Sequence, residues 1–76
     1  MGKKADVTVH IDEELDDART SQVCSTLEGV NGIQRVRCAE HQKHLIVVEF
    51  DPDAVDSHAV LDHVQRQGLH AELIGL

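Results

Sequence analysis

The chain has 76 residues, so it can build one hydrophobic core and no second lobe. Its 7 Lys and Arg face 14 Asp and Glu, which gives a formal net charge of −7 with the 6 His counted neutral. Because nucleic acids and anionic membranes are bound by neutralising phosphate with Lys and Arg, this balance argues against both as partners.

The apolar runs are too short to cross a bilayer, the longest being residues 45–48, and the first residues lack the apolar centre of a signal peptide. We therefore expect a soluble, cytoplasmic protein. Two cysteines, Cys24 and Cys38, are too few for the disulfide scaffold of a secreted protein. We expect both to be reduced and to pack as small apolar side chains.

The predicted elements begin with a strand over residues 6–11, where apolar and polar side chains alternate as in a half-buried strand. The acidic stretch 12–17 suits the start of a helix, because carboxylates are stabilised by the positive end of the helix dipole. Apolar and small side chains then recur at steps of three and four over residues 18–30, which predicts one buried helical stripe. Gly32 supplies the stop signal.

A hairpin is predicted next. Residues 33–38 and 44–50 are rich in strand-forming side chains, and the polar segment 40–43 between them suits a connection. Pro52 ends the second of these strands, because proline has no backbone donor for the sheet.

The last two elements are a helix and a strand. Asp56 or Ser57 is a good helix cap, and Gly68 closes the helix. Residues 69–76 alternate again and predict a terminal strand. The order is β-α-β-β-α-β, so we predict an α+β, ferredoxin-like fold with a four-stranded antiparallel sheet and two helices on one face.

We expect one domain over residues 6–76, after a short flexible lead over residues 1–5. Since the chain has a single Phe and no Trp or Tyr, its core must be packed mainly from aliphatic side chains. The residues expected to be buried together are Val7, Val9, Ile11, Val23, Leu27, Val48, Phe50, Leu61, Val64 and Leu73.

Three short segments stand in an order and spacing that recur in a known family. They are the end of the first helix, the end of the third strand and the turn into the last strand. Their matching residues are Leu27, Val30, Gly32, Ile33 and Val36, then Val48, Phe50, Asp51 and Pro52, and finally Gly68 and Ala71. In this pattern the chain, from Val7 to Leu73, resembles the heavy-metal-associated domain of copper chaperones and of metal-pumping ATPases.

The resemblance implies a Met-x-Cys-x-x-Cys loop after the first strand, whose thiolates hold a soft ion such as Cu(I) or Zn(II). Asp16 and Arg19 stand at the two cysteine positions, and Glu14 stands at that of the Met. An Arg guanidinium stays protonated and repels a cation. No catalytic triad or phosphate-binding Gly loop is evident. We therefore expect a non-enzymatic domain that has lost its thiolate site and acts through a protein partner in metal handling or transport.

An alternative function is binding of a divalent ion by histidine and carboxylate. His10 and His70 are expected on the outward face where the first and last strands meet, as possible cross-strand neighbours. With Asp12 or Asp16 they would offer two imidazoles and one carboxylate to Zn(II), Ni(II) or Cu(II). The other histidines are expected to be solvated surface residues, namely His41, His44, His58 and His63.

The outward face of the sheet is also a candidate contact surface. An apolar patch on an uncovered sheet suits a protein partner or a second copy of the chain, which would make the protein a monomer or a weak homodimer. Scattered exposed apolar side chains are also ordinary. The residues expected to form the patch are Thr8, Leu45, Val47 and Ile74.

Overall fold

A computed structural model describes residues 4–38 and 44–74 of the chain. The elements follow the predicted order, and the last strand is shorter than predicted at its start. The predicted hairpin connection, with His41, and the predicted end of the last strand lie outside the described residues. The elements are β1 (Ala5–Ile11), α1 (Asp17–Glu28), β2 (Ile33–Cys38), β3 (Leu45–Phe50), α2 (Ser57–Gln65) and β4 (Ala71–Ile74).

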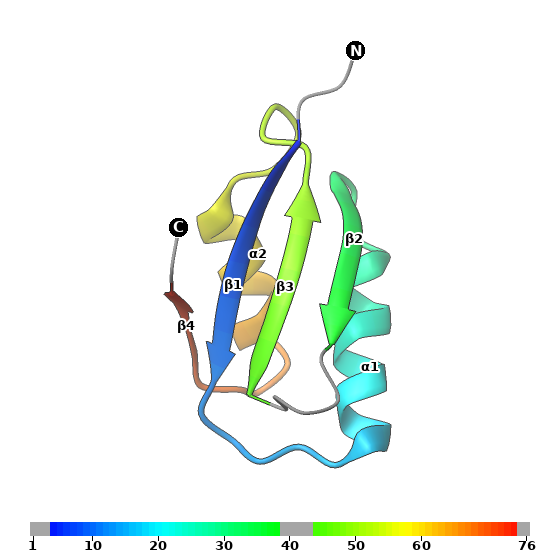
Figure 1. Cartoon of the computed structure of the whole chain (residues 1–76), viewed down its shortest axis with the longest axis vertical. Helices are drawn as coiled ribbons and strands as arrows, with labels where there is room; N and C mark the ends of the chain where they lie inside the picture. Colours follow the sequence, from blue (N-terminus) through cyan, green and yellow to red (C-terminus); the bar gives the residue numbers. More distant parts are fainter. Residues whose placement is uncertain (1–3, 39–43, 75–76) are drawn as a thin grey trace.

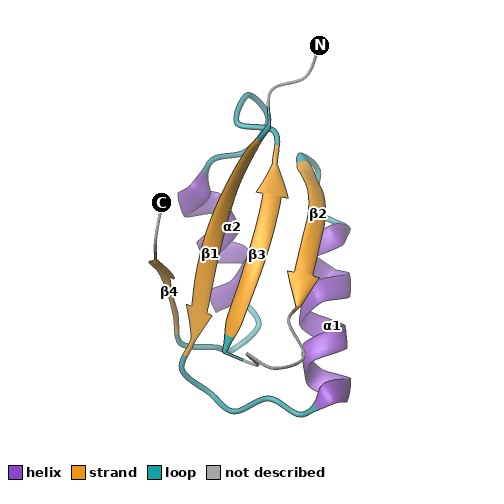
Figure 2. Cartoon of the chain, in the orientation of Figure 1, coloured by secondary structure: helices purple, strands orange, loops and turns teal. Residues whose placement is uncertain are grey.

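The strands form a single sheet in the order β2-β3-β1-β4, and every neighbouring pair is antiparallel. Both helices lie on the far side of the sheet as drawn in Figure 1, and no described element covers the near side (Figure 2). The predicted α+β, ferredoxin-like fold is therefore confirmed. Neither described helix has the length and apolar character needed to span a bilayer.

Both helices begin at an aspartate cap. The Asp16 carboxylate accepts a hydrogen bond from the Arg19 backbone N–H at 2.7 Å, and the Asp56 carboxylate accepts one from the Ala59 backbone N–H at 2.7 Å. Each cap satisfies a donor that the first helical turn leaves unpaired. Asp56, not Ser57, is therefore the cap of α2.

Gly32 makes the tight turn between α1 and β2. Its φ of 98° lies in the left-handed region that favours glycine. A Cβ at this position would also come within 3.0 Å of the side chains of Ala54 and Val55. The turn that contributes to the family resemblance therefore has a steric reason for its glycine.

The core lies between the sheet and the helices. Of the residues predicted to be buried, Leu61 and Leu73 are half-buried against the core, and the others are buried. Leu15 and Leu69, which lie outside the helices and strands, are buried as well and extend the core. Among the described residues, the buried apolar set is Val7, Val9, Ile11, Leu15, Val23, Leu27, Ile46, Val48, Phe50, Val60, Val64 and Leu69.

The two cysteines differ from the expectation. Cys24 of α1 and Cys38 of β2 are joined by a disulfide, so the prediction that both are reduced is wrong. Both are half-buried against the core, as small apolar side chains would be. The pair forms because α1 packs against β2, a tertiary contact that a separation of 14 residues does not reveal. Since disulfides are typical of oxidising compartments, the pair lends no support to the predicted cytoplasmic location.

Replacing Phe50 should test the core. Phe50 is 5% exposed, and the substitution Phe50→Ala should lower the free energy of unfolding by about 3–5 kcal/mol, because it removes buried contacts and leaves a cavity. Val47→Ala is the control, since Val47 lies on the uncovered face of the same strand and is only half-buried. Chemical denaturation should show a much smaller loss for the control, and equal losses would contradict the assignment of Phe50 to the core.

Candidate functional site

The loop between β1 and α1 is where the resemblance places the metal ligands. Asp16 caps α1 there, as described above. The Arg19 guanidinium donates a hydrogen bond to the Gln67 carbonyl oxygen at 2.6 Å and so ties the start of α1 to the end of α2. Leu15, between these positions and β1, is buried in the core. The side chains at both cysteine positions thus hold the loop in place.

Beside this loop lies a hollow of about 370 Å³, lined by Glu14, Leu15, Asp16 and His44. His44 Nδ1 lies 2.9 Å from the Ile11 carbonyl oxygen. Because a carbonyl only accepts, Nδ1 carries the proton in this contact. Within the described part of the chain, the polar atoms around the hollow do not converge as a set of metal ligands.

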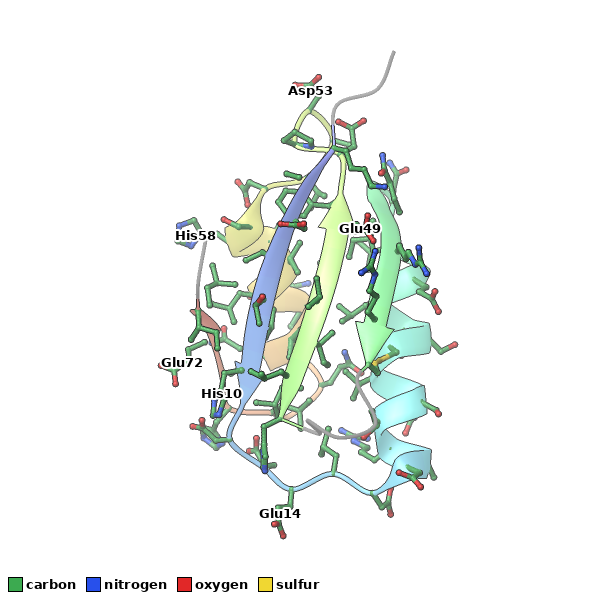
Figure 3. All side chains as sticks on the ribbon, viewed as in Figure 1. His10, Glu14, Glu49, Asp53, His58 and Glu72 are labelled. Atoms are coloured by element: carbon green, nitrogen blue, oxygen red, sulfur yellow. A yellow bond between two sulfur atoms is a disulfide. The ribbon has the colours of Figure 1, made fainter. Side chains whose placement is uncertain are left out.

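A different group of donors does converge, at the end of β1. One ligand atom each from His10, Asp12 and Glu72 lies within 4.8 Å of the others. His10 Nδ1 is 3.3 Å from an Asp12 carboxylate oxygen and 3.7 Å from a Glu72 carboxylate oxygen. Figure 3 shows His10 and Glu72 side by side at this end of the sheet.

This group differs from the predicted site. The register pairs His10 with Glu72 and Ile11 with Ala71, so the partner of His10 across the strands is Glu72 and not the expected His70. His70 lies before β4, where its carbonyl oxygen accepts from the Asp12 backbone N–H at 2.8 Å. Of the four residues predicted as metal ligands, the structure brings together His10 and Asp12, whereas Asp16 and His70 make other contacts.

His70 pairs instead with Glu13. The imidazole Nδ1 lies 2.6 Å from a Glu13 carboxylate oxygen, and the His70 backbone N–H donates to both oxygens at 2.9 and 3.1 Å. The hydrogen bond and negative charge of Glu13 raise the pKa of His70 above its usual value. The same hydrogen bonds, from the imidazole first and the backbone second, lower the pKa of Glu13. This pair closes the acidic loop against the start of β4.

The predicted contact residues lie in neighbouring rows across the uncovered face. Thr8 of β1 stands opposite both Val47 of β3 and Ile74 of β4. In the next row, Leu45 stands opposite His10. Ile74 is 38% exposed, and the other three residues are half-buried.

A buried glutamate on the same face was not foreseen. Glu49 of β3 is only 5% exposed, with Lys4 Nζ at 2.8 Å and Arg37 Nη2 at 3.1 Å from its carboxylate oxygens. The Lys4 hydrogen bond, together with the charges of Lys4, Arg37 and Arg35, lowers the pKa of Glu49. Strand alternation could have placed Glu49 on the uncovered face, and the register of β2 with β3 then sets it opposite Arg35. The result is a cationic border along the β2 side of the face.

The comparisons with known proteins bear on the fold. No protein-family model matches the chain, and no curated protein has a significantly similar sequence. Among solved structures, a copper-binding domain from HMA7, a P-type ATPase, is 24% identical, with 92% of this chain and 93% of that chain covered and a TM-score of 0.83. Oxidized MerP from Ralstonia metallidurans is 16% identical, with 96% and 100% covered and a TM-score of 0.85.

A copper chaperone of Enterococcus hirae, in its apo form, is 18% identical, with 90% of this chain and 98% of that chain covered and a TM-score of 0.79. These structures confirm the predicted resemblance to heavy-metal-associated domains at the level of the fold. The Cys-x-x-Cys pair that the resemblance implies is absent from this sequence.

A pH titration monitored by NMR of the His70 imidazole should detect the Glu13–His70 pair. We expect the pKa of His70 to lie above 6.5 and to fall toward that value in Glu13→Gln. Glu14→Gln is the control, because it removes the same charge from the adjacent position. An unchanged His70 pKa in Glu13→Gln would contradict the pair.

The effect of this pair on stability has a defined pH window. A raised His70 pKa contributes stability fully below pH 6.5, and this contribution is lost as pH rises through the folded-state pKa. A lowered Glu13 pKa contributes stability above pH 4.5, and this contribution is lost as pH falls through the folded-state pKa. The stability difference between the native chain and Glu13→Gln should therefore be largest between these pH values, and small because both side chains are solvated.

Proposed function

We propose that this chain is a small, non-enzymatic domain of the heavy-metal-associated fold that has lost its thiolate metal site and acts by protein contact in metal handling or transport. The hydrogen bonds of the Asp16 and Arg19 side chains support this most directly. One caps α1 and the other bonds to the Gln67 carbonyl oxygen, so neither is available to a metal ion in this arrangement. A soft ion such as Cu(I) needs thiolate or thioether ligands, which these positions do not offer.

The contact surface that we propose is the row of Thr8, Val47 and Ile74 with the adjacent Leu45. By strand alternation and register, its side chains lie on the face of the sheet opposite the one that carries the core. Arg35, Arg37 and the buried Glu49 border it on the β2 side. Glu72 of β4 stands in the same row as Leu45, across His10, and Asp12 follows the end of β1. A partner with an apolar centre and an acidic side toward β2 would complement this surface.

The proposed class of partner is a metal-transport protein. Structures similar to this chain include a copper chaperone and a copper-binding domain of a P-type ATPase. A second copy of the chain is the other candidate, and it would make a weak homodimer because the patch is small for a stable interface. Sedimentation over a range of concentrations separates the two, since only self-association gives a mass that rises with concentration.

The loss of the thiolate site should be visible in a Cu(I) competition assay under reducing conditions. The native chain should not withdraw Cu(I) from a chelator, whereas the double variant D16C/R19C, which restores the Cys-x-x-Cys spacing, should do so. A parallel series should repeat the comparison in a C24S/C38S background. In that background the loop cysteines of D16C/R19C are the only thiolates present. Cu(I) capture by the native chain that disappears in C24S/C38S would contradict the proposal.

The contact surface should be tested by adding charge to its exposed end. Ile74→Lys should weaken capture of a metal-transport partner at least about tenfold, because a Lys ammonium cannot be desolvated against an apolar surface without a partner charge. Ser21→Lys, at an exposed position of α1, adds the same charge on the other face of the molecule. Equal binding by both variants, with unchanged unfolding midpoints, would exclude the uncovered face as the contact.

A further inference from the structure

We infer that His10, Asp12 and Glu72 form a binding site for a divalent cation of the zinc type at the end of β1. The inference goes beyond the proposed protein contact and does not depend on it. The site uses one imidazole and two carboxylates, and it shares no ligand position with the loop that the resemblance marks for thiolates. Register and loop geometry bring the residues together, because Glu72 stands opposite His10 and Asp12 follows two positions after it.

The spacing of the donor atoms fits an ion. Zinc lies roughly 2.0–2.2 Å from nitrogen and oxygen ligands, so adjacent ligands of a tetrahedral site are roughly 3.3–3.6 Å apart. His10 Nδ1 lies 3.3 Å from the Asp12 oxygen and 3.7 Å from the Glu72 oxygen. The donors therefore need only small side-chain adjustments to surround a cation.

The condition of His10 Nδ1 is the second observation. The His10 side chain is 36% exposed, but its Nδ1 atom is covered and makes no hydrogen bond among the described residues, although two carboxylate oxygens lie close by. A buried polar atom without a partner is costly, and coordination would satisfy it. Coordination uses the Nδ1 lone pair, so a bound ion would take the place of any proton on this nitrogen.

His44 supports the orientation of His10. The two rings are stacked with centroids 5.9 Å apart and planes inclined by 22°. His44 is itself held by the Ile11 carbonyl oxygen, which lies 2.9 Å from Nδ1. A ring fixed in this way limits the rotation of its neighbour, much as outer-shell contacts orient the ligands of a metal site.

Charge and ligand type define the class of ion. Two carboxylates held within 4.8 Å of one another repel, and a divalent cation between them removes the repulsion. Imidazole suits borderline divalent ions such as zinc, whereas carboxylate suits harder ions, so the mixed set favours Zn(II) over the soft Cu(I). Asp12 and Glu72 are exposed, and three protein ligands leave the remaining coordination position to water.

The test is a Zn(II) titration of the tag-free chain at neutral pH. Calorimetry measures the affinity, and backbone NMR locates the site. Amide shifts should centre on His10, Asp12 and Glu72. Glu72→Gln, Asp12→Asn and His10→Gln should each weaken Zn(II) binding about tenfold or more, because each removes a ligand and the first two also remove a charge. The unfolding midpoint of each variant, measured without zinc, shows whether the fold is kept.

Two controls distinguish Zn(II) coordination at this site from nonspecific attraction of the cation to an acidic chain. Glu14→Gln removes one negative charge from the adjoining loop, and His70→Gln removes the nearby imidazole that is paired with Glu13. Both should leave Zn(II) affinity within about twofold of the native value. Absence of binding at millimolar Zn(II), equal weakening by Glu14→Gln and Glu72→Gln, or loss of binding in His70→Gln alone would each overturn the assignment. None of these results bears on Cu(I) capture or on the effect of Ile74→Lys.

Discussion

The alternation of side chains along β1 is the constraint on which the rest of the structure depends. β1 is paired on both sides, by β3 and by β4, so its register fixes both faces of the sheet at once. Val7, Val9 and Ile11 enter the core, and Thr8 and His10 are left on the uncovered face. A slip of one residue would exchange these sets, and the loss of buried apolar area makes such a slip unfavourable. The core therefore determines which residues are available for contact and for metal binding.

The loop after β1 is held in place by contacts of its own side chains. Asp16 satisfies a backbone donor of α1, and Arg19 reaches from α1 to the Gln67 carbonyl oxygen. Glu13 binds both the ring and the backbone of His70, which connects the loop to the start of β4. The Asp16 cap is local, whereas the Arg19 and Glu13 contacts join segments that are distant in sequence. Together they fix a segment that in a metal-binding loop would be ordered in part by the ion.

Much of the fold could be predicted from the sequence because its signals are local. Strand alternation, aspartate caps and the glycine turn determine the elements, and burial of one face of each determines the layers. The pairing register is not local. The expected cross-strand neighbour of His10 is His70, but Glu72 takes that place. The reason is that β4 begins at Ala71, whose pairing with Ile11 sets the partner of His10.

Tertiary contacts account for the other differences between the sequence-based predictions and the structure. The Cys24–Cys38 disulfide depends on how α1 lies against β2, and the burial of Glu49 depends on Lys4 reaching it from the residue before β1. The proposed contact row and the proposed cation site now lie in neighbouring rows of one sheet face, where Leu45, His10 and Glu72 adjoin Thr8, Val47 and Ile74. A divalent ion bound to two carboxylates would neutralise the acidic end of this face. Since complementary charge governs which partner approaches an apolar patch, the two proposed sites would then be coupled through electrostatics, without any change in the fold.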